Sequence, residues 1–242
     1  MLIVIGIPTY DNRVHAQLML ALLNEICRPD TPPMVVLSNH SSLLARGFNE
    51  LWCYALNHRP SATHFLMIHA DIIPEIGFAK RMVDEMESSG AGVLSVAMPL
   101  KDGRGITSTA LDGSEPRRVT LRELEGLPAT FDRSDLEKHF GQKGMLLVNS
   151  GLMLVDLRQN WVEKCYFAIN DYVRRRADGK FEPVTDSEDW FFSRAAQKAG
   201  ARVVANHSIL ARHAGEAMYP NRGTWGTHGR DDADASTGGT NV

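Results

Sequence analysis

Short apolar runs alternate with longer amphipathic segments along the first part of the chain. The apolar runs have the length and composition of strands that are covered on both faces, and the amphipathic segments repeat their apolar positions at helical spacing. Strands that alternate with helices are typical of a mostly parallel sheet between two helical layers. The pattern therefore predicts a single three-layer α/β domain. Its first strands are residues 2–7, 34–37 and 65–68, which are predicted to be buried, and residues 90–97, and its first helices are residues 14–27, 43–57 and 75–88.

The pattern changes in the middle of the chain. Residues 98–143 are polar and rich in charge, with one short helical stretch near Leu121, and they predict a variable loop region. Insertions of this length in a compact domain are usually lids or binding loops, so we expect this region to select the substrate. Apolar strands return at residues 144–154 and 201–205, the latter as the last strand, and a helix is predicted to begin near Asp156.

The end of the chain carries no apolar periodicity. Residues 222–242 are dominated by glycine, threonine and aspartate. A segment of this composition buries too little apolar surface to hold a fixed structure. The sequence therefore predicts a mobile C-terminal tail after a domain that spans residues 1–221.

Composition and charge narrow the class of protein. The chain has 242 residues, of which 43% are hydrophobic and 23% charged, and a net charge of −3. These values are ordinary for a soluble globular protein, and the charge argues against one that binds mainly by coating nucleic acid phosphates. The three cysteines, Cys27, Cys53 and Cys165, are odd in number and lack zinc-type spacing, and the apolar opening stops at Pro8. We therefore expect a cytoplasmic protein without a membrane span.

A histidine and a carboxylate follow the apolar run at residues 65–68. In open α/β sheets, ligands collect at the carboxyl ends of such strands. Residues two apart in an extended segment point the same way, so His69 and Asp71 can converge on one ion or one phosphate. The alternative is a plain turn before a helix that begins at Pro74. The sequence leaves both interpretations open.

A second polar interruption lies in the apolar run at residues 144–154. Asn149, Ser150 and Gly151 are small, and they allow a ligand to approach the backbone closely. The same three residues are also compatible with a β-bulge.

Two adjacent carboxylates precede the helix that ends near residue 199. Thr185 and Glu188 have the spacing of a capping box, so Glu188 can serve the helix N-terminus. Asp189 is not explained by capping, and beside Trp190 it is placed to be partly desolvated, as a general base needs to be. A lone histidine, His213, ends another apolar run and is more often structural than a ligand unless other ligands stand beside it.

Taken together, these motifs resemble the inverting GT-A fold glycosyltransferases of the broad family 2 type, which use nucleotide-diphosphate sugars. The resemblance covers roughly residues 2–214, and the order and spacing of its pieces are more specific than any one of them. The pieces are Pro8-Thr9-Tyr10, Ala45-Arg46-Gly47-Phe48-Asn49, His69-Ala70-Asp71, Asn149-Ser150-Gly151, Ser187-Glu188-Asp189-Trp190 and His213.

The resemblance implies a Rossmann-like nucleotide-binding fold and a role for each motif. In the family, two aspartates flank one residue at the strand end, and the second carries a divalent metal; Asp71 stands at that second position and His69 at the first. His213 is implied as a further metal ligand, and Asp189, with Glu188 beside it, as the catalytic base. Residues implied at the nucleotide are Pro8, Thr9, Tyr10, Arg46, Asn49, His69, Ala70 and Asp71, and those at the sugar or acceptor are Asn149, Ser150, Gly151 and Trp190.

Histidine in place of an aspartate bears on the metal. Mg²⁺ prefers oxygen ligands, whereas Mn²⁺ accepts imidazole, so His69 and His213 favour Mn²⁺ over Mg²⁺. The metal would stabilise the diphosphate that leaves, and Asp189 would take the proton of the acceptor hydroxyl.

The motifs identify neither the sugar nor the acceptor. A small molecule, a glycan and a modified DNA base, as in bacteriophages, are the acceptor classes to consider. Arg117-Arg118 and Arg174-Arg175-Arg176 would suit a phosphate-bearing acceptor, although a solvated helix face explains the latter run as well. Two alternatives from other classes are a non-catalytic nucleotide-sugar-binding module and a sugar-phosphate nucleotidyltransferase. The second lacks the expected glycine-rich, basic loop after the first strand.

Overall fold

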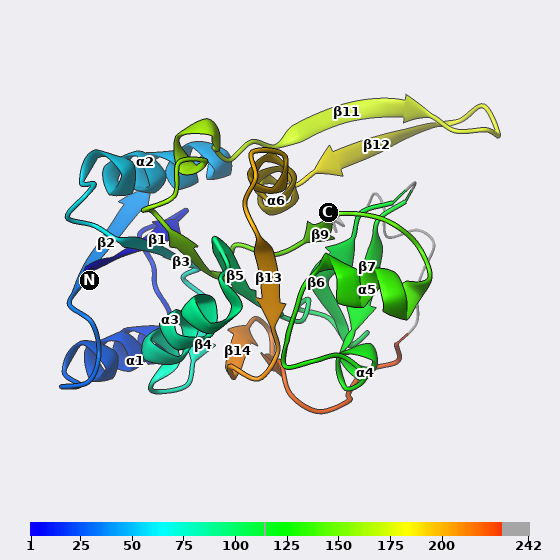
Figure 1. The fold of residues 1–242 in the computed structure, drawn as a ribbon. Helices are drawn as coiled ribbons and strands as arrows, with labels where there is room; N and C mark the ends of the chain where they lie inside the picture. Colours follow the sequence, from blue (N-terminus) through cyan, green and yellow to red (C-terminus); the bar gives the residue numbers. More distant parts are fainter. Residues whose placement is uncertain (114, 229–242) are drawn as a thin grey trace.

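Seven strands form the central sheet of the computed structural model, which describes residues 1–113 and 115–228 (Figure 1). Their order is β2-β1-β3-β10-β5-β13-β8. Five strands run parallel to one another, while β10 and β8 run antiparallel to their neighbours. The predicted mostly parallel sheet is thus confirmed. The bounds are β1 (Ile3–Thr9), β2 (Met34–His40), β3 (His64–Ile68), β5 (Val93–Val96), β8 (Thr130–Phe131), β10 (Leu152–Asp156) and β13 (Val203–Asn206).

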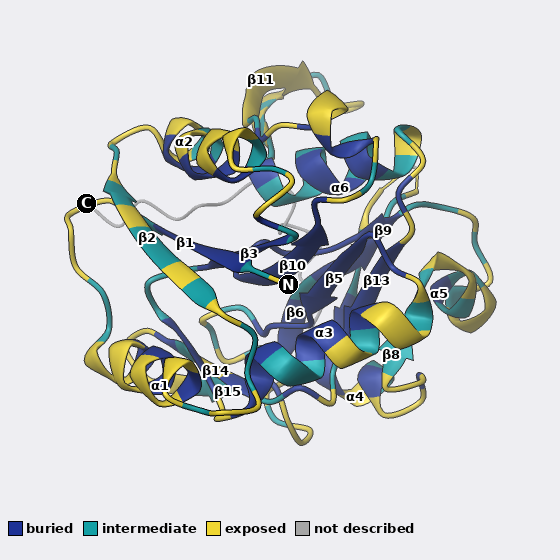
Figure 2. Cartoon of the chain, turned by 60° about the vertical axis from the view of Figure 1, so that its left-hand side comes forward, coloured by how far each residue is buried: buried dark blue, intermediate teal, exposed yellow. Residues whose placement is uncertain are grey.

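Helices cover both faces of this sheet, and two separate hydrophobic clusters fill the spaces between the layers. One cluster contains Phe48, Trp52 and Phe192 from α2 and α6, and the other contains Leu18 and Met82 from α1 and α3. Figure 2 shows a buried side on these helices toward the sheet and an exposed side outward. The three-layer α/β fold in one domain is therefore confirmed. The helices are α1 (Ala16–Ile26), α2 (Leu44–Asn57), α3 (Phe78–Ser89) and α6 (Glu188–Lys198).

The expected loop region at residues 98–143 is largely regular structure. A second sheet, in the order β7-β6-β9, forms there together with the following segment. Its apolar residues, such as Leu111, Val119 and Leu136, are buried in the same cluster as α6. The expectation of one short helix was wrong because these apolar residues are spread among charges too sparsely to show a period. The elements are β6 (Ile106–Leu111), β7 (Arg117–Thr120), α4 (Leu121–Leu124), α5 (Arg133–Phe140) and β9 (Leu146–Leu147).

Three predicted boundaries were wrong. Pro74 does not begin a helix, because β4 (Ile72–Pro74) pairs with β14 (Ala211–Ala214), which in turn pairs with β15 (Met218–Pro220), so residues 201–205 are not the last strand. The helix expected near Asp156 is absent from the described chain. The segment instead continues β10 and leads, through a short 3-10 helix, η1 (Val162–Lys164), to a hairpin of β11 (Asn170–Arg175) and β12 (Phe181–Asp186).

Two strands differ from the expected burial. β2 was predicted to be buried, but it lies at the edge of the sheet and alternates between half-buried and exposed residues. The β11–β12 hairpin projects from the body of the molecule (Figure 1), and every residue of β11 is exposed. The arginine run Arg174-Arg175-Arg176 therefore lies at this hairpin and not on a helix face.

The first part of the expected tail is packed against the domain. Trp225 lies against the hydrophobic cluster, and its indole N–H donates to the carbonyl of Pro220 at 2.8 Å. The backbone amides of Thr227 and His228 donate to the carbonyls of Gly103 and Arg104. The prediction of mobility from residue 222 is thus wrong for residues 222–228, and residues 229–242 lie outside the described part. No helix among the described residues is both long and apolar enough to span a membrane.

Candidate functional site

A cleft of about 450 Å³ opens where β1 and β3 end. The carboxyl ends of parallel strands are the usual ligand position in open α/β sheets. The cleft brings together six of the residues that the sequence predicts at a nucleotide. These are Pro8, Thr9, Tyr10, His69, Ala70 and Asp71, and the remaining lining residues are Asp11, Arg13, Val14, His15, Leu44 and Phe48.

The walls of the cleft combine fixed and exposed groups. The hydroxyl of Thr9 donates to the carbonyl of Asn39 at 2.6 Å, which ties the end of β1 to β2. Phe48 is fully buried and its ring lies 5.3 Å from that of His69. Tyr10 is 73% exposed, so its ring face is free for an aromatic partner. The cleft is thus lined by fixed side chains inside and by the exposed ring of Tyr10 at its entrance.

Asp71 lies in a turn and not in an extended segment as expected. β3 ends at Ile68, and the amide of Ile72 donates to the carbonyl of His69 at 3.0 Å. The alternation that would have aimed His69 and Asp71 at one point therefore does not apply. Instead, the backbone amide of Ala214 donates to the carbonyl of Asp71 at 2.8 Å, which brings β14 beside the turn.

Two basic side chains from distant segments meet the carboxylate of Asp71. The ammonium of Lys101 donates to Oδ2 at 2.7 Å, and Nε2 of His213 lies 3.5 Å from the same oxygen. Burial by itself raises the pKa of Asp71, but the hydrogen bonds and charges of His213 and Lys101 outweigh it and hold this pKa below its ordinary value. Asp71 is therefore ionised at neutral pH. Lys101 could not be singled out from the sequence, because its segment has no recognisable motif.

His69 points elsewhere. Its Nε2 shares a hydrogen bond of 3.1 Å with the hydroxyl of Ser150. Burial is the main cause that lowers its pKa to about 4, with the charge of Asp71 opposing the shift, so the ring is neutral at pH 7. This hydrogen bond directs Nε2 toward Ser150 and away from the position of a shared ligand with Asp71.

Asp71 and His213 are the two side chains that fit a divalent ion. No group of three or more histidine, cysteine, aspartate or glutamate side chains in residues 1–113 and 115–228 has that arrangement. The Nδ1 of His213 lies 2.9 Å from the carbonyl of Pro99, which accepts the Nδ1 proton, so Nε2 is the ring nitrogen that faces Asp71 and would lose its proton to ligate an ion. A carboxylate oxygen and an imidazole nitrogen aimed at one point are a suitable partial donor set for Mn²⁺, which would take its other ligands from phosphate and water.

The turn that leads into β10 consists of Asn149, Ser150 and Gly151. It is not a bulge in a continuous strand, because β9 ends at Leu147 and β10 begins at Leu152. The side-chain nitrogen of Asn149 donates to the carbonyl of Val96 at 2.8 Å, and its side-chain oxygen accepts from the backbone amide of Gly151. The carbonyl of Gly151 in turn accepts from the amide of His69. The turn therefore fixes His69, and a direct role in sugar binding stays a prediction.

The first turn of α6 carries the two predicted catalytic carboxylates. Its N-cap is Ser187, whose hydroxyl donates to Oδ1 of Asp189, and the amide of Trp190 donates to the same oxygen at 2.7 Å. The capping box of Thr185 and Glu188 is not formed, because Thr185 still belongs to β12. Glu188 is thus free of the capping role that the sequence allowed.

The two carboxylates have raised pKa values. Burial is the largest cause for both, and the neighbouring charge of Asp189 adds to it, so the pKa of Glu188 rises to about 7. Burial also raises the pKa of Asp189, but the hydrogen bonds from Ser187 and Trp190 and the charge of Arg118 oppose the rise. Both carboxylates are therefore less acidic than ordinary ones, as a group that exchanges a proton with a hydroxyl needs to be.

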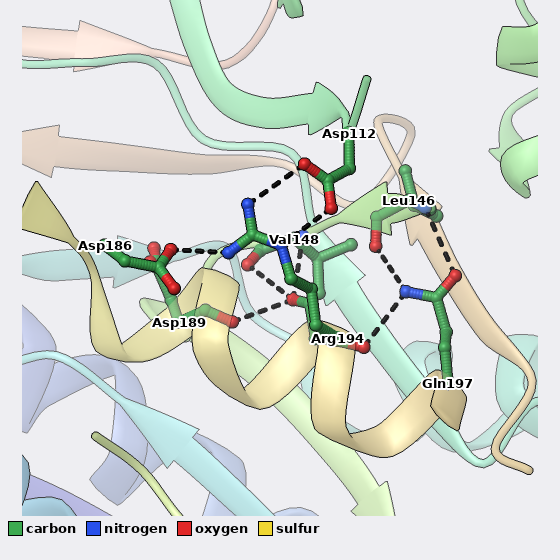
Figure 3. A network of polar contacts seen from close by, with 8 residues as sticks. Asp112, Leu146, Val148, Asp186, Asp189, Arg194 and Gln197 are labelled. Atoms are coloured by element: carbon green, nitrogen blue, oxygen red, sulfur yellow. Dashed lines mark hydrogen bonds and ion pairs between the residues drawn. The ribbon is translucent and has the colours of Figure 1, made fainter. Parts of the chain in front are cut away.

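One turn connects these carboxylates to the cleft. The hydroxyl of Ser193 donates to the carbonyl of Asp189 at 2.8 Å and accepts from the amide of Val148 at 3.0 Å (Figure 3). Val148 directly precedes the turn that carries Ser150, the partner of His69. The N-terminal turn of α6 is thus held one short segment away from the cleft.

An aromatic stack makes a second connection behind the cleft. Phe48 meets Phe167 edge to face at 5.4 Å, and Phe167 stacks on Phe192 of α6 at 4.5 Å between ring centroids. Such pairs in a buried position keep the elements that carry them in fixed relation. The sequence showed each aromatic residue but not that they meet.

Arg194 anchors α6 and was not singled out from the sequence. Its guanidinium donates to both oxygens of Asp112, at 2.7 and 3.0 Å, and also contacts Asp186 (Figure 3). The hydrogen bond that Arg194 donates to Asp112 is the main cause that raises the pKa of Arg194 above its ordinary value. Asp112 ends the second sheet and Asp186 ends β12, so one side chain fastens both to α6.

Arg46, Asn49 and Trp190 lie outside the lining of the cleft. Arg46 is exposed and pairs with Glu50. The amide group of Asn49 makes two hydrogen bonds to the backbone of Phe167, at 2.7 and 2.8 Å. The indole of Trp190 donates to the carbonyl of Ser108 at 3.0 Å, which joins α6 to β6. Asn49 and Trp190 are thus engaged in structural contacts.

Neither a protein-family model nor a curated protein matches this sequence. The fold is similar to that of A197 from STIV, with a TM-score of 0.51 and 18% identity over 88% of this chain and 86% of that chain. Residues 1–349 of S. aureus TarS match at a TM-score of 0.46 and 12% identity, and in complex with UDP-GlcNAc at 0.47 and 12%. The matches cover 91% of this chain but 60% and 58% of the TarS chains. The likeness to A197 shows the α/β fold of this chain alone.

Proposed function

We propose that this chain is a glycosyltransferase that moves a sugar from a nucleotide-diphosphate sugar to an acceptor hydroxyl with inversion. The observation that carries the proposal is one connected arrangement. A cleft with Lys101 and His213 at its Asp71 end is joined, through the turn at residues 148–151 and Ser193, to the helix turn that carries two carboxylates with raised pKa values. The first part suits a diphosphate, and the second suits proton removal from a hydroxyl.

The donor lies in the cleft in this proposal. Tyr10, exposed at the mouth, stacks on the base, while the end of β1 follows the ribose. The diphosphate lies at the other end, near Lys101, because its ammonium offers the positive charge that attracts phosphate oxygens. Arg46 and Asn49 take no part in donor binding.

A divalent ion would be held by Asp71 and His213. It would act as a Lewis acid on the diphosphate that leaves. Mn²⁺ is favoured over Mg²⁺ because one donor is an imidazole. His69 serves the site indirectly, since its hydrogen bond to Ser150 fixes the turn between the two halves.

Asp189 is the general base, and Glu188 retains a proton beside it. The hydrogen bonds from Ser187 and Trp190 stabilise the ionised form of Asp189, whereas Glu188, with a pKa of about 7, takes up the proton that relieves the repulsion between the two. Asp189 accepts the proton of the acceptor hydroxyl while the oxygen of that hydroxyl forms a bond to the anomeric carbon. The bond from that carbon to the diphosphate breaks, and the diphosphate leaves with the electron pair.

A thermal-shift screen with UDP, GDP, ADP and dTDP and their sugars, with and without MnCl₂, tests donor binding. One nucleotide should raise the melting temperature, and its sugar should then be hydrolysed slowly in the absence of an acceptor. Hydrolysis separates an enzyme from a non-catalytic binding module. A protein that binds none of these compounds, or that binds a nucleotide sugar and never cleaves it, contradicts the proposal.

A further inference from the structure

Lys101 contacts the carboxylate oxygen of Asp71 that a bound divalent cation would need as a ligand. Its ammonium lies 2.7 Å from Oδ2 of Asp71, and this is also the oxygen that Nε2 of His213 faces at 3.5 Å. An ion bound between Asp71 and His213 needs this oxygen as a ligand. The ammonium of Lys101 therefore occupies the place beside Oδ2 of Asp71 that the divalent ion would take.

The backbone that carries Lys101 is fixed, whereas its ammonium is not. The amides of Thr227 and His228 donate to the carbonyls of Gly103 and Arg104, two and three positions after Lys101 in the chain. The aliphatic stem of Lys101 packs on Gly215, where an added Cβ would lie 3.1 Å from its Cδ. The side chain is nevertheless 43% exposed. The ammonium can therefore swing away on its stem while the loop stays in place.

The geometry points to Lys101 as a built-in competitor of the divalent ion, displaced from Asp71 only when a diphosphate arrives to receive it. The ion and the diphosphate then bind together, and the ion binds weakly alone. This inference rests on the proposed function, because it concerns the same cleft and the same donor.

Charge explains why the two cations exclude each other. Two positive charges held against the same oxygen repel each other, and a divalent ion doubles the repulsion that a unit charge would exert. Lys101 and the ion therefore cannot both contact Oδ2 of Asp71. A diphosphate changes the balance, because its oxygens accept hydrogen bonds from the displaced ammonium and ligate the ion as well.

Direct Mn²⁺ titration of the purified full chain, followed by the electron paramagnetic resonance signal of free Mn²⁺, tests this without turnover. The Lys101→Met variant should bind Mn²⁺ about 10-fold more tightly than the wild type, within the usual range of such couplings. Lys101→Arg keeps the charge and should show no gain. The double variant Asp71→Asn with Lys101→Met should lose the gain, because the negatively charged carboxylate that binds the ion is replaced by a neutral amide.

Lys80→Met is the matched control. Lys80 also pairs with an aspartate, Asp84, but on the exposed side of α3 and outside the cleft lining. It should bind Mn²⁺ like the wild type. An equal gain in Lys80→Met, or no gain in Lys101→Met proteins that melt like the wild type, overturns the inference.

A second measurement uses inorganic pyrophosphate at a fixed free Mn²⁺ concentration. Pyrophosphate should raise the Mn²⁺ affinity of the wild type more than that of Lys101→Met, because the variant has no competitor to displace. Equal effects overturn the inference. If pyrophosphate affects both proteins equally but sugar transfer requires Mn²⁺, the inference on Lys101 is wrong and the proposed function stands. If pyrophosphate affects the wild type more but no nucleotide sugar is ever cleaved, the proposed function is wrong and the inference on Lys101 stands.

Discussion

A β-carbon on Gly105 would lie 1.9 Å from the carbonyl oxygen of Trp225. The backbone of Gly105 has a φ of +68°, which side-chain-bearing residues rarely adopt. The C-terminal segment and the loop that begins at Lys101 are therefore in direct backbone contact. Anything that disturbs this contact reaches the cleft through Lys101.

Gly105→Ala should lower stability by about 1–3 kcal/mol, because it combines a strained φ with the loss of this close approach. Thermal melts measure the effect. Gly103→Ala is the control in the same loop, since an added Cβ there meets no atom within 4 Å. Equal melting temperatures for the two variants would contradict the packed arrangement.

Truncation after Arg222 should lower the melting temperature by several degrees. It removes Trp225, which packs on the hydrophobic cluster, and the amides of Thr227 and His228 that hold the Lys101 loop. A chain that ends at His228 keeps these contacts and is the reference. If the chains that end at Arg222 and at His228 melt at the same temperature, residues 223–228 do not contribute to stability.

Glu188→Gln should stabilise the protein increasingly as the pH rises. A carboxyl whose pKa is raised from 4.5 to about 7 by folding contributes stability below pH 4.5, and this contribution is lost as the pH rises through 7. The glutamine does not ionise, so the variant should gain up to about 3 kcal/mol over the wild type between pH 4.5 and 8.

Melting curves at pH 4.5, 6 and 8 follow this difference. Glu163→Gln, at a 73% exposed side chain, is the control and should show no such trend. A constant difference between Glu188→Gln and the wild type across this range would mean that the pKa of Glu188 is not raised.

Asp189→Asn should lower turnover by about 10²-fold or more and leave donor affinity nearly unchanged, because only the proton acceptor is removed. Transfer to an acceptor, or hydrolysis of the donor, measures turnover, and calorimetry measures donor affinity. Near-normal turnover would exclude Asp189 as the base and direct attention to Glu188.

Asn49→Ala should destabilise the protein by about 1–3 kcal/mol, since it leaves both backbone groups of Phe167 without their partners. Donor affinity should not change in the folded variant. Arg46→Ala, in the same helix and exposed, should alter neither quantity. A selective loss of donor affinity in either variant would restore the nucleotide-binding role that the sequence predicted.

The candidate site could be predicted in part. The strand-end position of Asp71 and the adjacent pair Glu188 and Asp189 followed from local pattern, because strand ends and helix starts are marked by short-range sequence features. Lys101 could not be predicted, since it reaches Asp71 across 30 positions of sequence without a motif. Likewise, nothing local shows that Asn49 hydrogen-bonds the backbone of Phe167, 118 positions away.

By itself, the sequence determined the three layers, the first strands and helices, and the place where a cleft would open, because periodic burial of apolar residues sets these features. Tertiary structure alone decided the order β3-β10-β5, the second sheet within residues 98–143, and the packing of residues 222–228. It also decided the electrostatics of the site. Hydrogen bonds and charges from distant residues lower the pKa of Asp71, while burial raises that of Glu188, and neither effect is encoded in neighbouring residues.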